Sequence, residues 1–294
     1  GAYWMLLGGG SIDGQARLIL YKSTDLENWI YQGNIELTGI DLELGYMYEC
    51  PSYIEIDGKD VLFLSLMGRT PMGERFHNEF SSVYFVGELS LEDKTFHVES
   101  FDEIDKGFDF YAPQSFEDER GRRILIGWMG IPDADYTNPT EEAGWQHALT
   151  IPRKLSVRDG KLIQEPIEEL KQLRSNDKAV CTFSYGQALI MQNSIYEAVI
   201  DFKRCREMTM TLREGITLSY KDNILTLNLG VYGSGRTTRK VKLEKLEHLH
   251  IFADTSSLEI FVNHGEEVFT TRIYNHYGRL LINGECSGIM TVYP

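Results

Sequence analysis

At 294 residues, with 42% apolar and 25% charged side chains, the chain has the composition of a globular protein of one large or two smaller domains. Its net charge of −15 argues against a nucleic-acid partner, because binding to phosphates needs a basic patch. The longest apolar runs are too short to span a membrane, so no membrane partner is expected. The composition fits a protein that acts on a small, neutral, polar molecule.

The cysteines are scattered along the chain, at Cys50, Cys181, Cys205 and Cys286. None has the spacing of a zinc site, and isolated thiols in a chain of this size favour a reducing compartment over a disulfide scaffold. We therefore expect a cytoplasmic protein without a metal or another cofactor. The opening residues, Gly1–Met5, have the pattern of the middle of a β-strand, so we also expect the natural protein to begin before Gly1.

Short β-strands separated by turns dominate the first half of the sequence. Gly8–Ser11 lacks the lysine of a phosphate-binding loop and predicts a turn. Asp57-Gly58 and Asp159-Gly160 are dipeptides typical of β-hairpins. The regular spacing predicts repeated four-stranded sheets, as in a β-propeller, with strands at Ala16–Tyr21, Val61–Met67, Val83–Leu89 and Ile124–Trp128.

A helix is predicted at Pro166–Arg174, where proline suits the first turn and Ile167, Leu170 and Leu173 share one face. Beyond it the strands become longer and alternate between apolar and polar residues, as at Leu258–Asn263. No sequence repeat supports propeller blades, so the pattern alone predicts an all-β chain. We expect a first part with short strands over residues 1–165, a short helical linker at 166–177 and a β-sandwich over 178–294.

Glu49 is the first candidate for chemistry, because it follows the aromatic run Tyr46–Tyr48 and precedes Cys50-Pro51. A carboxyl group held among apolar side chains prefers its neutral form, so its pKa rises, as a general acid near neutral pH requires. The proline biases Cys50 toward an extended backbone. The competing interpretation is a surface glutamate at a strand end, which composition alone favours because most glutamates are exposed.

The stretch Gly107–Gln114 places Asp109 between two phenylalanines and just before Tyr111. Polar groups among aromatic rings suit a sugar pocket, where rings stack on the sugar and polar atoms bind its hydroxyls. A strand end that packs its aromatic side chains explains the same residues equally well. The two interpretations stay open at this point.

Two later stretches and a pair of histidines have simpler explanations. Trp145–Arg153 fits a strand ended by a proline, and Asp254–Gly265 fits a sandwich core, to which we assign no catalysis. His248 and His250 share one face of a predicted strand. Without a third ligand nearby, a structural role is favoured over metal binding.

Taken in chain order, these stretches resemble glycoside hydrolase family 32, which contains invertases, fructanases and sucrose-6-phosphate hydrolases. Tyr48–Pro51 is similar to the Glu-Cys-Pro motif of the family, and Asp109–Ala112 to its Asp-Phe-Tyr-Ala motif. Later landmarks lie at Gly127–Met129, Leu149–Arg153 and Asp254–Gly265. The resemblance covers essentially the whole chain and implies a five-bladed β-propeller followed by a β-sandwich.

The resemblance also implies retaining hydrolysis of terminal β-D-fructofuranosides, with sucrose or sucrose 6-phosphate as the small carbohydrate partner. Glu49 would be the acid/base that protonates the leaving oxygen and then activates water. Retention places the two catalytic carboxyl groups about 5–5.5 Å apart. Cys50, Asp109, Tyr111 and Trp128 are expected around the fructosyl ring, although Asp109 could instead hold a loop.

Two motifs of the family do not occur in this sequence. One, similar to Trp-Met-Asn-Asp-Pro-Asn-Gly, carries the aspartate nucleophile, and the other, Arg-Asp-Pro, stabilises the transition state. The resemblance places both before Gly1, so we expect an incomplete propeller and an inactive 294-residue chain. The alternative is a non-catalytic carbohydrate-binding or assembly module of the same family. An arabinan-type propeller enzyme fits less well, because the sandwich signature belongs to the fructosidase group.

The sequence leaves the identity of the fructoside and the oligomeric state open. Four arginines, at Arg69, Arg75, Arg122 and Arg123, are available as phosphate-binding cations. The unpaired sheet edges of an incomplete propeller favour aggregation or a partner chain.

Overall fold

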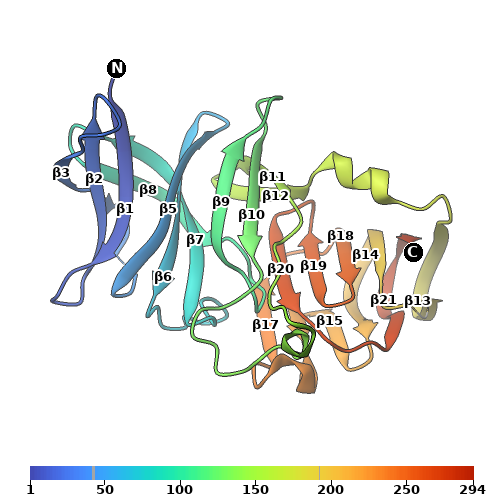
Figure 1. Ribbon diagram of the computed structural model, residues 1–294. Coiled ribbons are helices and arrows are strands. Elements are labelled where there is room, and N and C mark those ends of the chain that lie inside the picture. The colour runs from blue at the N-terminus through green and yellow to red at the C-terminus, as the bar shows by residue number, and fades with distance from the viewer. Residues whose placement is uncertain (42–43, 192) are drawn as a thin grey trace.

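The computed structural model describes residues 1–41, 44–191 and 193–294, and within these residues the chain is almost entirely β-structure (Figure 1). In this part of the chain three sheets follow one another from the N-terminal end, and a nine-stranded sheet forms the C-terminal part. The two chain ends lie at opposite ends of an elongated molecule. The predicted all-β class, with propeller sheets before a β-sandwich, is confirmed.

Each of the first three sheets is built mainly from strands that are neighbours in sequence, the arrangement of a propeller blade. The first sheet contains β1 (Tyr3–Gly10), β2 (Ala16–Ser23) and β3 (Ile30–Asn34). The second contains β5 (Met47–Ile56), β6 (Lys59–Met67), β7 (Phe80–Ser90) and β8 (Thr95–Glu103), and β4 (Glu36–Thr38) pairs in parallel with β8. The third contains β9 (Tyr111–Glu117), β10 (Arg123–Trp128), β11 (Arg153–Arg158) and β12 (Lys161–Pro166).

The two predicted hairpin turns are confirmed. Asp57-Gly58 joins β5 to β6, and Asp159-Gly160 joins β11 to β12. Both aspartates have φ of 51°, and the two glycines have φ of 74° and 75°. Two successive positive φ angles are what a two-residue type I′ turn requires, and they explain why aspartate and glycine stand there.

The first strands of successive sheets lie side by side, β1 against β5 and β5 against β9 (Figure 1). Two glycines of β1 permit this approach: a Cβ at Gly8 would lie 2.3 Å from the backbone oxygen of Tyr48, and a Cβ at Gly10 would lie 2.7 Å from that of Tyr46. The turn predicted at Gly8–Ser11 is therefore wrong for the glycines, which belong to β1. The chain turns just after them, where the Gly14 amide donates to the Ser11 carbonyl over 2.9 Å.

Replacing Gly8 with alanine should lower the free energy of unfolding by about 1–3 kcal/mol, the usual cost of overpacking, because the obstructing atom is backbone and has no rotamer to change. Urea unfolding followed by circular dichroism measures this change. Gly9→Ala is the matched control, since its Cβ would lie 3.5 Å from Ile19 Cδ1, an ordinary contact. Equal unfolding midpoints for the two variants would contradict the close approach of β1 and β5.

The segment between β12 and β13 (Ala179–Met191) contains the predicted helix in a shorter form. It is the 3₁₀-helix η2 (Glu168–Leu173), and Leu173 is 81% exposed, so the expected burial of an apolar face is wrong at that residue. The short length fits the poorer hydrogen-bond geometry of 3₁₀-helices. A second 3₁₀-helix, η1 (Pro139–Ala143), lies in the loop between β10 and β11. The domain boundaries at 165/166 and 177/178 stay predictions.

The C-terminal sheet folds over itself because its longest strand serves two layers. β14 (Tyr196–Arg213) pairs through its first part with β18 (His248–Asp254) and through its last part with β15 (Ile216–Lys221). β21 (Gly278–Tyr293) pairs with β14 along most of its length and also with β13. β16 (Ile224–Asn228) and β17 (Thr238–Lys242) continue one layer, β19 (Ser257–Val262) and β20 (Glu267–Arg272) continue the other, and η3 (Gly230–Gly233) lies between β16 and β17.

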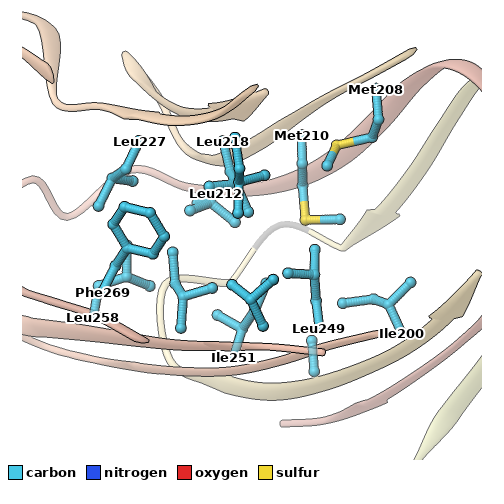
Figure 2. Packing of buried hydrophobic residues seen from close by; sticks show 14 of the residues in the cluster. Ile200, Met208, Met210, Leu212, Leu218, Leu227, Leu249, Ile251, Leu258 and Phe269 are labelled. Carbon is cyan, nitrogen blue, oxygen red and sulfur yellow. The ribbon is translucent and has the colours of Figure 1, made fainter. Parts of the chain in front are cut away.

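A single apolar core fills the space between the two layers. Figure 2 shows side chains of β14 and β15, among them Met210 and Leu218, facing Leu249 and Ile251 of β18. All of these side chains are buried. Removing this apolar surface from water is the main force that holds the two layers together.

Strand β19 departs from the predicted alternation. Leu258, Ile260 and Val262 face the sandwich core as expected, but Glu259 and Phe261 on the opposite face are also buried, at 3% and 1% exposure. A strand buried on both faces needs a partner for any polar side chain that it carries. For Glu259 that partner comes from the third propeller sheet.

The contact between the third sheet and the sandwich, called the seam below, is centred on the fully buried Arg153 of β11. Its guanidinium donates to the Asp105 carboxylate over 3.0 Å and to the Glu259 carboxylate over 2.8 Å. It also donates to the Thr270 hydroxyl over 2.6 Å, while the Thr270 amide donates to Asp105 over 2.8 Å. Buried charges that are paired and hydrogen-bonded in this way fix the orientation of the two parts, because separating them would leave a charge without a partner.

Asp109 belongs to the same seam and is 1% exposed. One carboxylate oxygen accepts hydrogen bonds from Arg236 over 3.0 Å and from Tyr136 over 3.1 Å. The other accepts from the Thr271 hydroxyl over 3.0 Å and from the Arg272 amide over 2.7 Å. Four donors occupy this carboxylate, so it fastens the start of β9 to the sandwich. The structure favours the holding role over the sugar-contact role for Asp109.

Asp109→Ala should lower the free energy of unfolding by about 1–3 kcal/mol, because it leaves the buried Arg272 amide without its acceptor and removes the carboxylate partner of Arg236. Chemical unfolding of the purified chain measures the change. Glu247→Ala is a control on an exposed ion pair with Lys245, whose removal should change stability little. An Asp109→Ala chain as stable as the parent would remove Asp109 from the seam.

Candidate active site

Glu49 stands in the first strand of the second sheet, directly before an irregularity in the pairing. It lies opposite Ser65 of β6, and the next pair is Ser52 with Phe63, so β5 contains one extra residue at this point. Such a β-bulge bends a strand and redirects its side chains. Cys50, within the bulge, has φ of 47°, so the extended backbone predicted for it from Pro51 is wrong.

A matching bulge lies in the first strand of the third sheet. Trp128 of β10 pairs with Tyr111, and Ile126 pairs with Gln114, so β9 also contains one extra residue. The residue before its proline, Ala112, has φ of 46°. A positive φ before proline thus occurs next to Glu49 in β5 and next to Tyr111 in β9. The two adjacent strands therefore bend at corresponding places.

The two bulged strands meet in one hydrogen bond. The Tyr111 hydroxyl donates to a carboxylate oxygen of Glu49 over 2.7 Å, although 62 residues separate them. Burial, followed by the hydrogen bond to Glu49 and the charge of Glu49, raises the pKa of Tyr111, so this hydroxyl keeps its proton and remains a donor. The Ser65 hydroxyl, opposite Glu49 in the β5–β6 pairing, is buried and pairs with the Ser82 hydroxyl over 3.1 Å. Glu49 is half-buried, with one oxygen held in place by a fixed donor.

The aromatic neighbours of Glu49 in sequence do not surround it. Tyr46 is 49% exposed, and Tyr48 packs from the other face of β5 into the apolar core between the first two sheets. The ring that reaches the carboxylate, Tyr111, comes from β9. The expected apolar setting from the run Tyr46–Tyr48 is therefore replaced by a mixed setting of one ring and two hydroxyl groups.

Trp128 completes one side of the site at the end of β10. Its ring makes an edge contact with His147, with centroids 4.8 Å apart and planes at 70°. A Cβ at Gly130 would lie 2.4 Å from the indole, so the glycine leaves room for the ring. Trp128 is half-buried and pairs with Tyr111, which places it one strand further from Glu49. A partly exposed indole in this position suits stacking on a sugar ring.

The thiol of Cys50 is half-buried beside the carboxylate. Burial, and then the charge of Glu49, raise the pKa of Cys50, so it remains a neutral thiol. The structure brings Glu49, Cys50, Tyr111 and Trp128 into neighbouring positions of β5, β9 and β10, whereas Asp109 is bound in the seam.

Sequence reasoning missed two contributors to the site. Ser65 is a fully buried hydroxyl in an otherwise apolar strand, which is a usable signal because a buried polar group needs a partner. His147, whose φ is 63°, belongs to a stretch that we assigned only to a strand end. Its contact with Trp128 depends on the long loop between β10 and β11, and nothing local in the sequence indicates it.

The histidines considered for metal binding and the arginines considered for phosphate binding contact side chains of this chain. His248 and His250 bind Asp201 and Glu197 over 2.8 and 2.6 Å, and no group of metal-ligating side chains is found among the described residues. Arg75 pairs with Asp102, and Arg122 pairs with Asp118 and Glu169. Arg123 pairs with Glu117, and Arg69 lies over the ring of Phe76.

Among the residues that the structure describes, no helix is long and apolar enough to cross a membrane.

Curated relatives match nearly the whole chain. It is 39% identical over 291 residues to the sucrose-6-phosphate hydrolase of Staphylococcus xylosus. This match covers 93% of this chain and 58% of the relative. It is 35% identical over 299 residues to the sucrose-6-phosphate hydrolase of Bacillus subtilis, covering 98% of this chain and 62% of that relative. The chain thus spans about six tenths of the length of these proteins.

Solved structures and family descriptions agree with these relatives. The sucrose-6-phosphate hydrolase of Lactobacillus gasseri superposes with a TM-score of 0.88 at 25% identity, over 100% of this chain and 63% of that one. A family 32 β-fructofuranosidase of Bombyx mori superposes with a TM-score of 0.82 at 27% identity, over 99% of this chain and 62% of that one. The N-terminal domain of glycosyl hydrolases family 32 matches residues 1–166, and the C-terminal domain of the same family matches residues 166–289. The chain belongs to glycosyl hydrolase family 32.

Proposed function

We propose that this chain provides the acid/base part of a retaining β-fructofuranosidase, with Glu49 as the acid/base. The hydrogen bond from Tyr111 to Glu49 carries the proposal, because it holds one carboxyl oxygen and leaves the other for a substrate. Cys50, the next residue of β5, supplies a neutral thiol, and Trp128, which pairs with Tyr111 from β10, supplies a ring face for a sugar. The names of the relatives support a fructoside as the substrate.

Glu49 would act in two steps of the reaction, first as an acid and then as a base. Its proton goes to the glycosidic oxygen as the bond to the anomeric carbon breaks, and the resulting carboxylate then takes a proton from the water that attacks the fructosyl-enzyme. Tyr111 keeps its own proton throughout, so it orients the carboxyl group without exchanging protons with the substrate. Tyr111 is therefore a positioning residue in this proposal.

The proposal assigns the nucleophile to a segment outside these 294 residues. The two aspartate motifs of the family do not occur in the sequence, which supports this assignment. By itself the chain should release no fructose from sucrose or sucrose 6-phosphate. Appreciable hydrolysis by the 294-residue chain would overturn the assignment, since the nucleophile would then lie within it.

Sucrose 6-phosphate is the favoured substrate, because the relatives that are 39% and 35% identical to this chain are named sucrose-6-phosphate hydrolases. A cytoplasmic location fits this substrate and the four free cysteines. The non-catalytic alternative, a carbohydrate-binding module, predicts that the natural full-length protein binds a fructoside without hydrolysing it. Equilibrium binding measured beside fructose release separates the two.

In the full-length protein, Glu49→Gln should lower kcat on sucrose 6-phosphate by about 10²–10⁴-fold, the usual contribution of general acid–base catalysis. A fructoside with a nitrophenolate leaving group needs no proton, so its first step should be nearly unaffected. Glu55→Gln, an exposed glutamate in the same strand, is the matched control. An unchanged rate for Glu49→Gln on both substrates would dismiss Glu49 as the acid/base.

Tyr111→Phe in the same protein should lower kcat by about 10–100-fold, because a hydrogen bond to a charged group contributes about 1.5–3 kcal/mol. The loss should appear mainly in kcat, since Tyr111 acts on Glu49 and not on the sugar. Tyr53→Phe is the control: its hydroxyl donates to Asp60 over 2.6 Å from the same strand as Glu49. Steady-state kinetics of both variants test this, and equal rates would remove Tyr111 from the site.

A further inference from the structure

Two of the four cysteines face each other at the corner of the sandwich. Cys205 of β14 and Cys286 of β21 are direct partners in the antiparallel pairing, and both are free thiols. They are 81 residues apart in sequence, so only the fold brings them together. Neither thiol has a role in the proposed function.

The corner is where β14 passes from one layer to the other. Its pairing with β18 ends at Asp201, and its pairing with β15 begins at Met208. Between these points β14 has two bulges relative to β21, one on each side of the pair Arg204–Cys205. Strands that change layers commonly do so through bulges, so this geometry follows from the sandwich itself.

The corner also exposes one of the two thiols. A cleft of about 550 Å³ is lined by Cys205, with Arg204 and Arg206 of β14, Tyr220 of β15 and Lys245. Cys205 is half-buried in this cleft, whereas Cys286 is 2% exposed and packs in the sandwich core. A reagent in solution therefore meets Cys205 first and reaches Cys286 only through it.

The separation of the two residues suits a covalent link. Directly opposed residues of antiparallel strands have Cα atoms about 4.5–5.5 Å apart, and disulfides accept Cα separations of about 4.4–6.8 Å. The pairing of Cys205 with Cys286 therefore places the two residues at a separation that a disulfide can span.

We propose that Cys205 and Cys286 form a site of reversible oxidative modification, in which a hydroperoxide converts the facing thiols into a disulfide that links β14 to β21 at the sandwich corner. Cys205 is the residue that reacts with the peroxide. Cys286 is the residue that closes the disulfide.

The reaction balances with hydrogen peroxide as the oxidant. The Cys205 thiolate attacks one peroxide oxygen, the O–O bond breaks, and the products are a sulfenic acid and hydroxide. The Cys286 sulfur then attacks the Cys205 sulfur, the S–S bond forms, the S–O bond breaks, and the second hydroxide leaves. The protons from the two thiols convert both hydroxides to water, so two thiols and one peroxide give one disulfide and two waters.

Exposure sets the order of reaction, because Cys205 lines the cleft and is half-buried, whereas Cys286 is buried in the core. Because the thiolate is the reactive form, oxidation should become faster as the pH rises.

The reduced chain, treated with hydrogen peroxide and then freed of it, should lose two of its four free thiols in a titration under denaturing conditions. A non-reducing peptide map should show Cys205 joined to Cys286 within one chain, and dithiothreitol should restore all four thiols. Cys181→Ser is the matched control: Cys181 lies opposite Met290 in the same sheet, so this variant should still lose two thiols.

Two variants test the assigned order. Cys205→Ser should abolish the loss of two free thiols on treatment with hydrogen peroxide. Cys286→Ser should leave a sulfenic acid at Cys205, which dimedone traps. The peptide map of the unaltered chain decides the proposal even where a variant does not fold. A map with no Cys205–Cys286 link, a link between two chains, or a link through Cys50 or Cys181 would overturn it.

Discussion

The hydrogen bond between Tyr111 and Glu49 depends on an anchor two residues earlier in the chain. Asp109 fastens the start of β9 to Thr271 and the Arg272 amide of the sandwich, and Tyr111 begins the strand that follows. The donor that positions Glu49 is thus set by contacts with the C-terminal part. Glu49, Cys50, Tyr111 and Trp128 all lie outside the sandwich, yet the sandwich fixes the strand that carries Tyr111.

A second constraint comes from the close passage of the first strands. Glycine at Gly8 and Gly10 lets β1 lie against β5, and bulges at Cys50 and Ala112 bend β5 and β9 at corresponding points. The close approach of β1 requires residues without a side chain. Each bulge contains a residue with positive φ directly before a proline. Two of the non-glycine residues with positive φ, Cys50 and Ala112, lie next to Glu49 and Tyr111. Unfavourable backbone conformations of this kind are common at functional sites.

Local patterns were sufficient to predict the strands and the two aspartate–glycine turns, because alternation and turn geometry depend on neighbouring residues. They were not sufficient for Glu49, since its partner lies 62 residues away in another sheet. Asp109 and Glu259 show the same limit: each bears a charge that the sequence alone assigns to a pocket or to solvent. In the structure Glu259 pairs with the buried Arg153, and Asp109 accepts hydrogen bonds from the half-buried Arg236 and from the sandwich. The proposed role of Glu49 comes from the resemblance to the family, and the fold brings Tyr111 against its carboxylate.

The continuous course of β14 through both layers has a consequence for how the sandwich comes apart. Its first part is hydrogen-bonded to β18 and its last part to β15, and β21 accompanies it across the corner. Neither layer can lose its order while the other keeps it, because each would have to release half of a shared strand. Amide protons in the two layers should therefore exchange with solvent through one common opening event, with the sandwich acting as a single cooperative unit.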